Sequence, residues 1–146
     1  MPPQTRSDRS SVRPYRLVLA DDREDILEEV CRLLASDFEI VAAVKSGTAL
    51  LQAAAELKPD AVLCDIYMPG QNGIECGAKI LRDGLSRAII LLSIYNEAHL
   101  VRKALREGIQ GYVLKEDASS ELAPAVYAVM AGGTYLSRGV SRPEPQ

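Results

Sequence analysis

Five polar side chains stand where short apolar runs of this chain end: Asp21, Asp22, Asp65, Ser93 and Lys115. If these runs are parallel strands, their carboxyl ends lie at one edge of a sheet, where ligands of such sheets bind. Three carboxylates gathered there repel one another, which raises their pKa values unless a cation neutralises them. The pattern therefore predicts a divalent cation at this edge.

The chemistry of these residues favours magnesium and a phosphoryl group. The available ligands are oxygen atoms without a nearby His or Cys, which suits Mg²⁺, with Mn²⁺ as an alternative. The Lys115 ammonium and the Ser93 hydroxyl would bind the oxygens of a phosphoryl group on Asp65. Asp65 is then the nucleophile, and because a carboxylate is a weak one, positioning and charge neutralisation must do the work without a general base.

Each of these residues also has a simpler interpretation when taken alone. Asp21 and Asp22 could cap the helix that follows them, a common use of Asp, and Ser93 could cap the next helix in the same way. Lys115 could be a solvated lysine at a strand end. The phosphoryl-site hypothesis depends on all of them lying together.

The elements expected to position these residues alternate along the chain. Continuous apolar runs predict buried strands at 17–20, 39–44, 61–65, 88–93 and 111–114. Apolar residues at helical spacing predict helices at 23–35, 48–57, 74–82, 97–107 and 119–131. Short loops between them predict an α/β fold, a five-stranded parallel doubly wound sheet with five helices on its two faces.

Length, charge and hydropathy narrow the class of protein. A chain of 146 residues fits one domain, and its apolar runs are far shorter than the roughly 20 residues of a membrane-spanning helix. The first 16 residues lack the apolar core of an export signal. A net charge of −3 argues against general nucleic-acid binding. The three cysteines form no CxxC pair, which favours reduced, buried thiols over a zinc site.

The motifs that contain these residues resemble the receiver domain of two-component response regulators. The resemblance is closest to the subgroup that usually carries a C-terminal helix-turn-helix output domain of the LuxR type. It covers 16–137, which leaves 1–15 as a flexible N-terminal tail and 138–146 as a C-terminal tail or a truncated linker. The motifs are LVLADD, PDAVLCDIYMPGQNGIE, ILLS and GIQGYVLK.

The resemblance assigns a role to each residue near the acceptor. It implies a flavodoxin-like sheet of strand order 2-1-3-4-5, with Asp65 as the phospho-acceptor. Asp22 would bind the metal directly, Asp21 largely through water, and Tyr67 through its backbone carbonyl. Phosphorylation would come from a sensor histidine kinase in the cytoplasm. The chain would be a signalling domain that promotes only its own phosphorylation and dephosphorylation.

The resemblance also implies a switch. Ser93 and Lys115 would hold the phosphoryl oxygens, and the ring of Tyr112 would turn inward as Ser93 moves toward the phosphoryl group. The surface that changes would be formed by the predicted helices at 97–107 and 119–131 with the strand between them. Partners, including a second copy of this chain in a homodimer, would bind there. Taken alone, Tyr112 could be an ordinary half-buried strand residue.

Two positions depart from many receivers. Glu116 follows Lys115 where proline is common, although the LuxR-type subgroup often lacks that proline. Tyr67 and Tyr95, each two residues beyond a predicted site residue, flank the path that a hydrolytic water must take. Both are bulky, so we expect slow loss of the phosphoryl group.

Three other functions fit these residues less well. A phosphate-independent interaction module would usually lack an acidic residue or the lysine, and this chain keeps them. An enzyme using aspartyl phosphate needs a general acid two residues after the nucleophile, where Tyr67 stands. A flavin- or dinucleotide-binding domain needs a Gly-rich loop after the first strand, where the sequence is DDRED. Whether the chain is a stand-alone receiver or part of a longer regulator is left open.

Overall fold

The structure, a computed structural model, describes residues 13–140. Its strands form one parallel sheet in the order β2-β1-β3-β4-β5-β6. The strands are β1 (Arg16–Ala20), β2 (Glu39–Val44), β3 (Ala61–Cys64), β4 (Ala88–Ser93), β5 (Gly111–Leu114) and β6 (Tyr135–Leu136). The order of the first five strands confirms the predicted doubly wound sheet.

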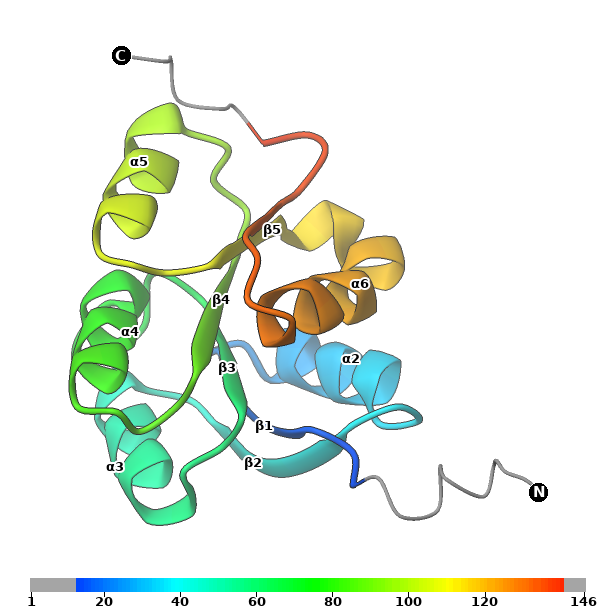
Figure 1. Ribbon diagram of the computed structural model, residues 1–146, viewed down its shortest axis with the longest axis vertical. Helices are drawn as coiled ribbons and strands as arrows, with labels where there is room; N and C mark the ends of the chain where they lie inside the picture. The colour runs from blue at the N-terminus through cyan, green and yellow to red at the C-terminus, as the bar shows by residue number, and fades with distance from the viewer. Residues whose placement is uncertain (1–12, 141–146) are drawn as a thin grey trace.

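The helices connect successive strands and cover both faces of the sheet. They are α2 (Glu24–Leu34), α3 (Gly47–Leu57), α4 (Gly73–Arg82), α5 (Ala98–Arg106) and α6 (Ala118–Met130), with a short 3₁₀ helix, η1 (Lys115–Asp117), before α6. Figure 1 shows α3, α4 and α5 on one face and α2 and α6 on the other. None of the helices between residues 13 and 140 is long and apolar enough to cross a membrane.

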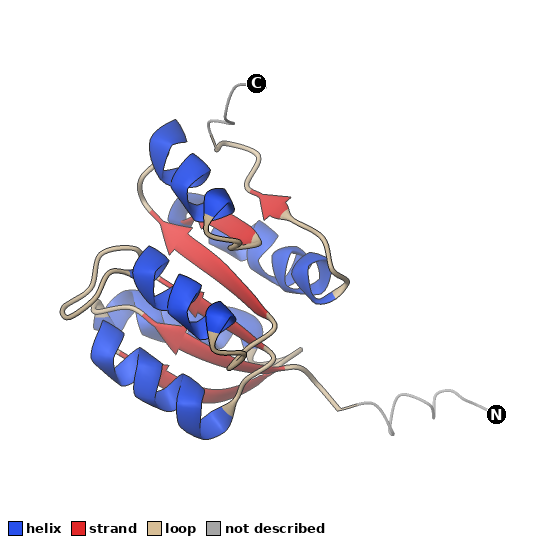
Figure 2. Ribbon diagram, turned by 60° about the vertical axis from the view of Figure 1, so that its left-hand side comes forward, coloured by secondary structure: helices blue, strands red, loops and turns tan. Residues whose placement is uncertain are grey.

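Two hydrophobic clusters hold these layers together, one on each face. Alternate residues of the central strands enter opposite clusters: Val62 lies in the cluster under α3, α4 and α5, and Leu63 in the cluster under α2 and α6. β3, β4 and β5 are buried along their whole length, which explains why their sequences are apolar apart from Ser93 at the end of β4. The helices therefore enclose the sheet faces (Figure 2) and leave the strand ends for polar side chains.

The sixth strand was not predicted. Tyr135 and Leu136 pair in parallel with Gly111 and Tyr112, which adds a short strand outside β5. The backbone N–H of Tyr135 donates to the carbonyl of Gln110 at 2.9 Å. The chain after α6 thus returns along the sheet edge, and the orange-to-red segment in Figure 1 follows β5.

The ends of the predicted domain are only partly described. Residues 1–12 and 141–146, which include most of both predicted tails, lie outside the described residues. Arg138, Gly139 and Val140, which the sequence analysis placed in the C-terminal tail, are described, and Val140 is buried in the cluster under α5. The exact limits of the domain stay a prediction.

Candidate functional site

Neighbouring strands bring Asp21 and Asp65 together. Ala20 and Cys64 are partners in the β1–β3 ladder, so the residues after them leave the sheet side by side. The N–H of Asp65 donates to the carbonyl of Ala20 at 3.0 Å, which continues the ladder by one bond. Both carboxylates are buried.

These two residues form an acidic cluster with Asp22. One carboxylate oxygen from each of Asp21, Asp22 and Asp65 lies within 4.8 Å of the others. Asp22 is exposed, so the cluster opens to solvent on one side. Such a group of oxygen ligands can hold a hard divalent cation.

Lys115 reaches the same cluster from the end of β5. Its Nζ lies 2.8 Å from Oδ2 of Asp21 and 3.4 Å from Oδ2 of Asp65. The side chain is only 13% exposed, so the two ion pairs are poorly screened by water. One ammonium faces two buried carboxylates, and the immediate site keeps an excess of negative charge.

Two observations on the acidic groups support a cation at this position. Oδ2 of Asp21 is buried, and the ammonium that contacts it, that of Lys115, is shared with Asp65. Burial raises the pKa of Asp65, and the charge of Asp21 adds to the rise, whereas Lys115 opposes it. The donor set and this uncompensated charge fit a divalent cation.

Asp21 and Ser93 are not the N-cap residues of the helices that follow them. The N-cap residue of α2 is Arg23, and Oδ1 of Asp21 accepts from its backbone N–H at 2.9 Å. The N-cap residue of α5 is Glu97, four residues after Ser93. The two side chains are therefore used at the strand ends and not as helix caps.

Ser93 is buried and holds the loop that follows β4. Its Oγ accepts a hydrogen bond from the backbone N–H of Tyr95 at 2.9 Å. The hydroxyl of Tyr112 donates to the carbonyl of Tyr95 at 2.6 Å, and its ring is buried. The ring of Tyr112 thus already points inward in this structure.

The two tyrosines beside the predicted phosphoryl path touch each other. The rings of Tyr67 and Tyr95 are edge to face, with centroids 5.2 Å apart and planes at 86°. They are 50% and 38% exposed. They thus form one aromatic pair between the loops that follow β3 and β4.

Gly73 is a site residue that the sequence analysis did not single out. Its N–H donates to the carbonyl of Ile66 at 2.6 Å, which closes the loop after Asp65. A Cβ at this position would lie 2.0 Å from the carbonyl oxygen of Asp65. Only glycine permits this close approach, and the signal was its place in the motif MPGQNG.

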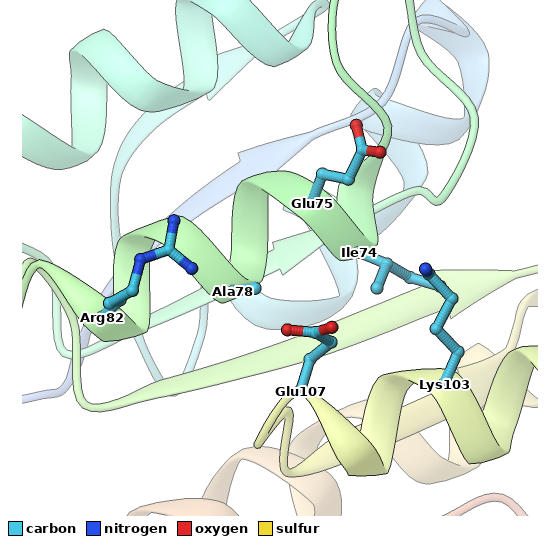
Figure 3. A pocket seen from close by; sticks show the side chains of 6 residues that line it. All are labelled: Ile74, Glu75, Ala78, Arg82, Lys103 and Glu107. Carbon is cyan, nitrogen blue, oxygen red and sulfur yellow. The ribbon is translucent and has the colours of Figure 1, made fainter.

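A separate hollow of about 170 Å³ lies between α4 and α5. Figure 3 shows the side chains around it, which combine apolar and oppositely charged groups. They are Ile74, Glu75, Ala78, Arg82, Lys103 and Glu107. None of the predicted site residues is among them, so this hollow is distinct from the acidic cluster.

The parallel sheet and the strand-end cluster define a receiver fold, and sequence comparison identifies the family. Residues 17–127 match the family described as response regulator receiver domain. The chain therefore belongs to the receiver domains of two-component response regulators. A transcriptional regulatory protein of Bacillus subtilis, LnrK, is 33% identical over 124 residues, which are 83% of this chain and 56% of LnrK. The chain thus spans little more than half of this relative.

Solved structures agree with this assignment. A LuxR-family two-component response regulator from Aurantimonas has a TM-score of 0.81 at 28% identity, covering 87% of this chain and 92% of that chain. The isolated receiver domain of RcsB from Salmonella enterica, solved with the phosphomimetic BeF₃⁻, has a TM-score of 0.79 at 26% identity, covering 87% and 96%. Both are signalling proteins of the same family.

Proposed function

We propose that this chain is a phosphorylation-controlled switch in which Asp65 accepts a phosphoryl group from the phosphohistidine of a sensor histidine kinase. The observation that carries the proposal is the contact of Lys115 with both Asp21 and Asp65 at the mouth of the acidic cluster. Phosphoryl transfer needs groups that hold a metal ion and groups that offset the charge of the phosphoryl oxygens. A lysine paired with two buried carboxylates, beside the exposed Asp22, supplies such groups.

The transfer requires one bond to form and one to break. A carboxylate oxygen of Asp65 attacks phosphorus while the P–N bond of phosphohistidine breaks, and its electron pair stays on the imidazole nitrogen. Lys115 offsets the negative charge on the phosphoryl oxygens, and the Ser93 hydroxyl donates to one of them. The product is an acyl phosphate on Asp65, and no separate substrate is turned over.

The metal is Mg²⁺ in this proposal, with Mn²⁺ as a substitute. Asp65, Asp22 and the backbone carbonyl of Tyr67 would hold it directly, and Asp21 largely through water. When bound, it neutralises charge on the phosphoryl oxygens and on the acidic cluster. The burial of Oδ2 of Asp21, whose cation Lys115 is shared with Asp65, supports this assignment.

Phosphorylation would change the surface formed by α5, β5 and α6, and partners would detect this change. Ser93 and Tyr112 are both bonded to Tyr95, so a change at Ser93 reaches β5 through one residue. A partner or a second copy of this chain would bind this surface. The domain would span residues 16–137, act in the cytoplasm and make no direct contact with nucleic acid.

Intact-mass spectrometry after incubation with a small phosphodonor tests the proposal. Wild type and Asp65→Asn are compared with and without Mg²⁺. The gain of one phosphoryl group only in wild type with Mg²⁺ supports Asp65 as the acceptor. No gain with either an acyl phosphate or a phosphoramidate, in a folded protein, would contradict it.

A further inference from the structure

The last described residues form a strap across the sheet edge. We define the C-terminal strap as residues 134–140. Its first half continues the sheet, because the N–H of Tyr135 and of Ser137 donate to the carbonyls of Gln110 and Tyr112, each at 2.9 Å. The ladder fixes this half to β5.

Ser137 anchors the middle of the strap in a buried polar cluster. Its Oγ lies 2.7 Å from Oε1 of Glu121 and 2.9 Å from Oδ2 of Asp117, and the N–H of Leu114 donates to it at 3.2 Å. Ser137 and Glu121 are buried. The hydroxyl thus links the strap to α6 and to the end of β5, and the acceptor site takes no part in this anchor. The N–H of Arg138 donates to Oε2 of Glu121 at 3.4 Å, so Arg138 belongs to the same anchor.

The last two residues of the strap are attached differently, to the loop that follows β4. The side-chain amide of Asn96 donates to the carbonyl of Gly139 at 2.6 Å. Val140 is buried in the cluster that contains Leu100 and Tyr112, and its N–H donates to the carbonyl of Ser137 at 3.0 Å. Asn96 therefore joins Gly139 of the strap to the loop that Ser93 holds.

We propose that Asn96 couples the acceptor site to the strap, so that phosphorylation of Asp65 loosens Gly139 and Val140. The inference rests on the proposed function. Ser93 and Asn96 are three residues apart, with Tyr95 between them bonded to Ser93 and Tyr112. A displacement of Ser93 is thus passed along one short, hydrogen-bonded segment.

The strand order gives the direction of the effect. Asp65 follows β3 on one side of β4, whereas the strap lies beyond β5 on the other side. When Ser93 moves toward a phosphoryl group on Asp65, the loop moves away from Gly139. The Asn96 hydrogen bond weakens, while the ladder of Tyr135 and Ser137 with β5 stays intact.

Linkage makes the coupling reciprocal. If phosphorylation loosens the strap, loosening the strap favours the phosphorylated state by the same factor. Asn96→Ala should therefore bind a phosphomimetic more tightly than wild type, by about fivefold, the lower end of typical coupling. A substitution that only damaged the fold would weaken binding of the phosphomimetic. Tighter binding therefore distinguishes coupling from a purely structural role of Asn96.

Amide hydrogen exchange followed by NMR tests the inference, with Mg²⁺ and BeF₃⁻ as the probe. Signals of residues 65–70 report binding, and those of Tyr135, Ser137, Arg138 and Val140 report the strap. We expect BeF₃⁻ to speed exchange at Val140 but not at Tyr135, Ser137 and Arg138, which belong to the anchored part of the strap. In Asn96→Ala, exchange at Val140 should be fast before BeF₃⁻ is added.

Two variants serve as controls. Asn96→Gln keeps the amide donor and should restore part of the protection, and Thr134→Ala changes an exposed strap residue outside the coupling and should behave as wild type. Binding of BeF₃⁻ with unchanged or slower exchange at Val140 overturns this inference alone. Absence of any response at residues 65–70 overturns the proposed function and this inference with it.

Discussion

The ammonium nitrogen of Lys115 lies 2.8 Å from the buried Oδ2 of Asp21. The pair joins the end of β1 to the residue after β5, although β3 and β4 lie between these strands. Asp21 thus holds the lysine over the acidic cluster in the absence of a phosphoryl group. An ammonium fixed in advance costs little reorganisation during phosphoryl transfer.

Replacing Lys115 with Met should destabilise the metal-free protein. The substitution keeps the aliphatic stem but leaves Asp21 and Asp65 buried without their cation. We expect the free energy of unfolding to fall by about 3 kcal/mol, the lower end for breaking a buried ion pair. Urea unfolding in a chelator measures this, with Lys115→Arg as the charge-conserving control. Equal stability of Lys115→Met and wild type would contradict the role given to the ion pairs.

Asp65→Asn should stabilise the metal-free protein against unfolding, and this gain in stability should increase with pH. Burial and Asp21 raise the pKa of Asp65 in the folded state. Between its ordinary value and this raised pKa, the unfolded chain has lost the proton and the folded protein has kept it, so stability falls as pH rises. The advantage of Asp65→Asn over wild type should therefore grow through this window and then stay constant.

Thermal unfolding in a chelator at several pH values measures that advantage, which we expect to reach about 3 °C. Asp37→Asn, at an exposed position outside the site, controls for the loss of one charge. If Asp65→Asn is less stable than wild type at every pH, the attraction of Lys115 for the Asp65 carboxylate outweighs the cost of burying that carboxylate.

Adding Mg²⁺ should stabilise wild type against unfolding. A ligand that binds only the folded state contributes about 2.7 kcal/mol at a concentration of 100 times its Kd. Asp22→Asn should lose most of this gain at little structural cost, because Asp22 is exposed and belongs to the cluster. Differential scanning fluorimetry across a Mg²⁺ titration gives both values. The same gain in both proteins would exclude Asp22 as a ligand.

Replacing Tyr67 or Tyr95 with Ala should speed the loss of the phosphoryl group from Asp65. Each substitution removes half of the edge-to-face pair and opens the path of the attacking water. We expect about fivefold faster decay, equivalent to roughly 1 kcal/mol of activation free energy. Because the rings act as one unit, the double variant should decay little faster than either single variant.

Intact-mass spectrometry over time follows this decay. Tyr127→Ala is a matched control, since Tyr127 is as exposed as Tyr67 but lies on α6, where it contacts Phe38. Unchanged decay in both Tyr67→Ala and Tyr95→Ala would rule out the proposed shielding.

Gly73→Ala should disrupt the loop that carries Asp65. The new Cβ would lie 2.0 Å from a backbone oxygen, so the backbone at Asp65 must shift. We expect a loss of about 3 kcal/mol or more in the free energy of unfolding. Gly84→Ala, at positive φ with no atom within 4 Å of the added Cβ, should cost only about 1 kcal/mol. Similar losses in chemical denaturation would contradict the steric explanation.

The sequence predicted the five central strands and five helices because each has its own local signal. β4 is a run of six buried residues, and the amphipathic pattern of α5 repeats at helical spacing. β6 has neither signal, since it contains two residues and exists through its pairing with β5. Its position depends on tertiary contacts that no local pattern encodes.

The acidic cluster was easier to predict than the contacts around it. Asp21 and Asp65 directly follow strands, so the sheet topology alone brings them together. The bonds of Tyr112 to Tyr95 and of Asn96 to Gly139 depend on the path of a loop. Gly73 was visible in a motif, but its steric role needed the backbone positions.

The short strand β6 also protects the sheet from unwanted strand addition. Without Tyr135 and Leu136, the backbone groups of β5 would form an open edge that another chain could pair with. β5 is apolar along its length, so such pairing would favour aggregation. We therefore expect loss of this two-residue strand to promote aggregation in concentrated samples, even where the fold itself is kept.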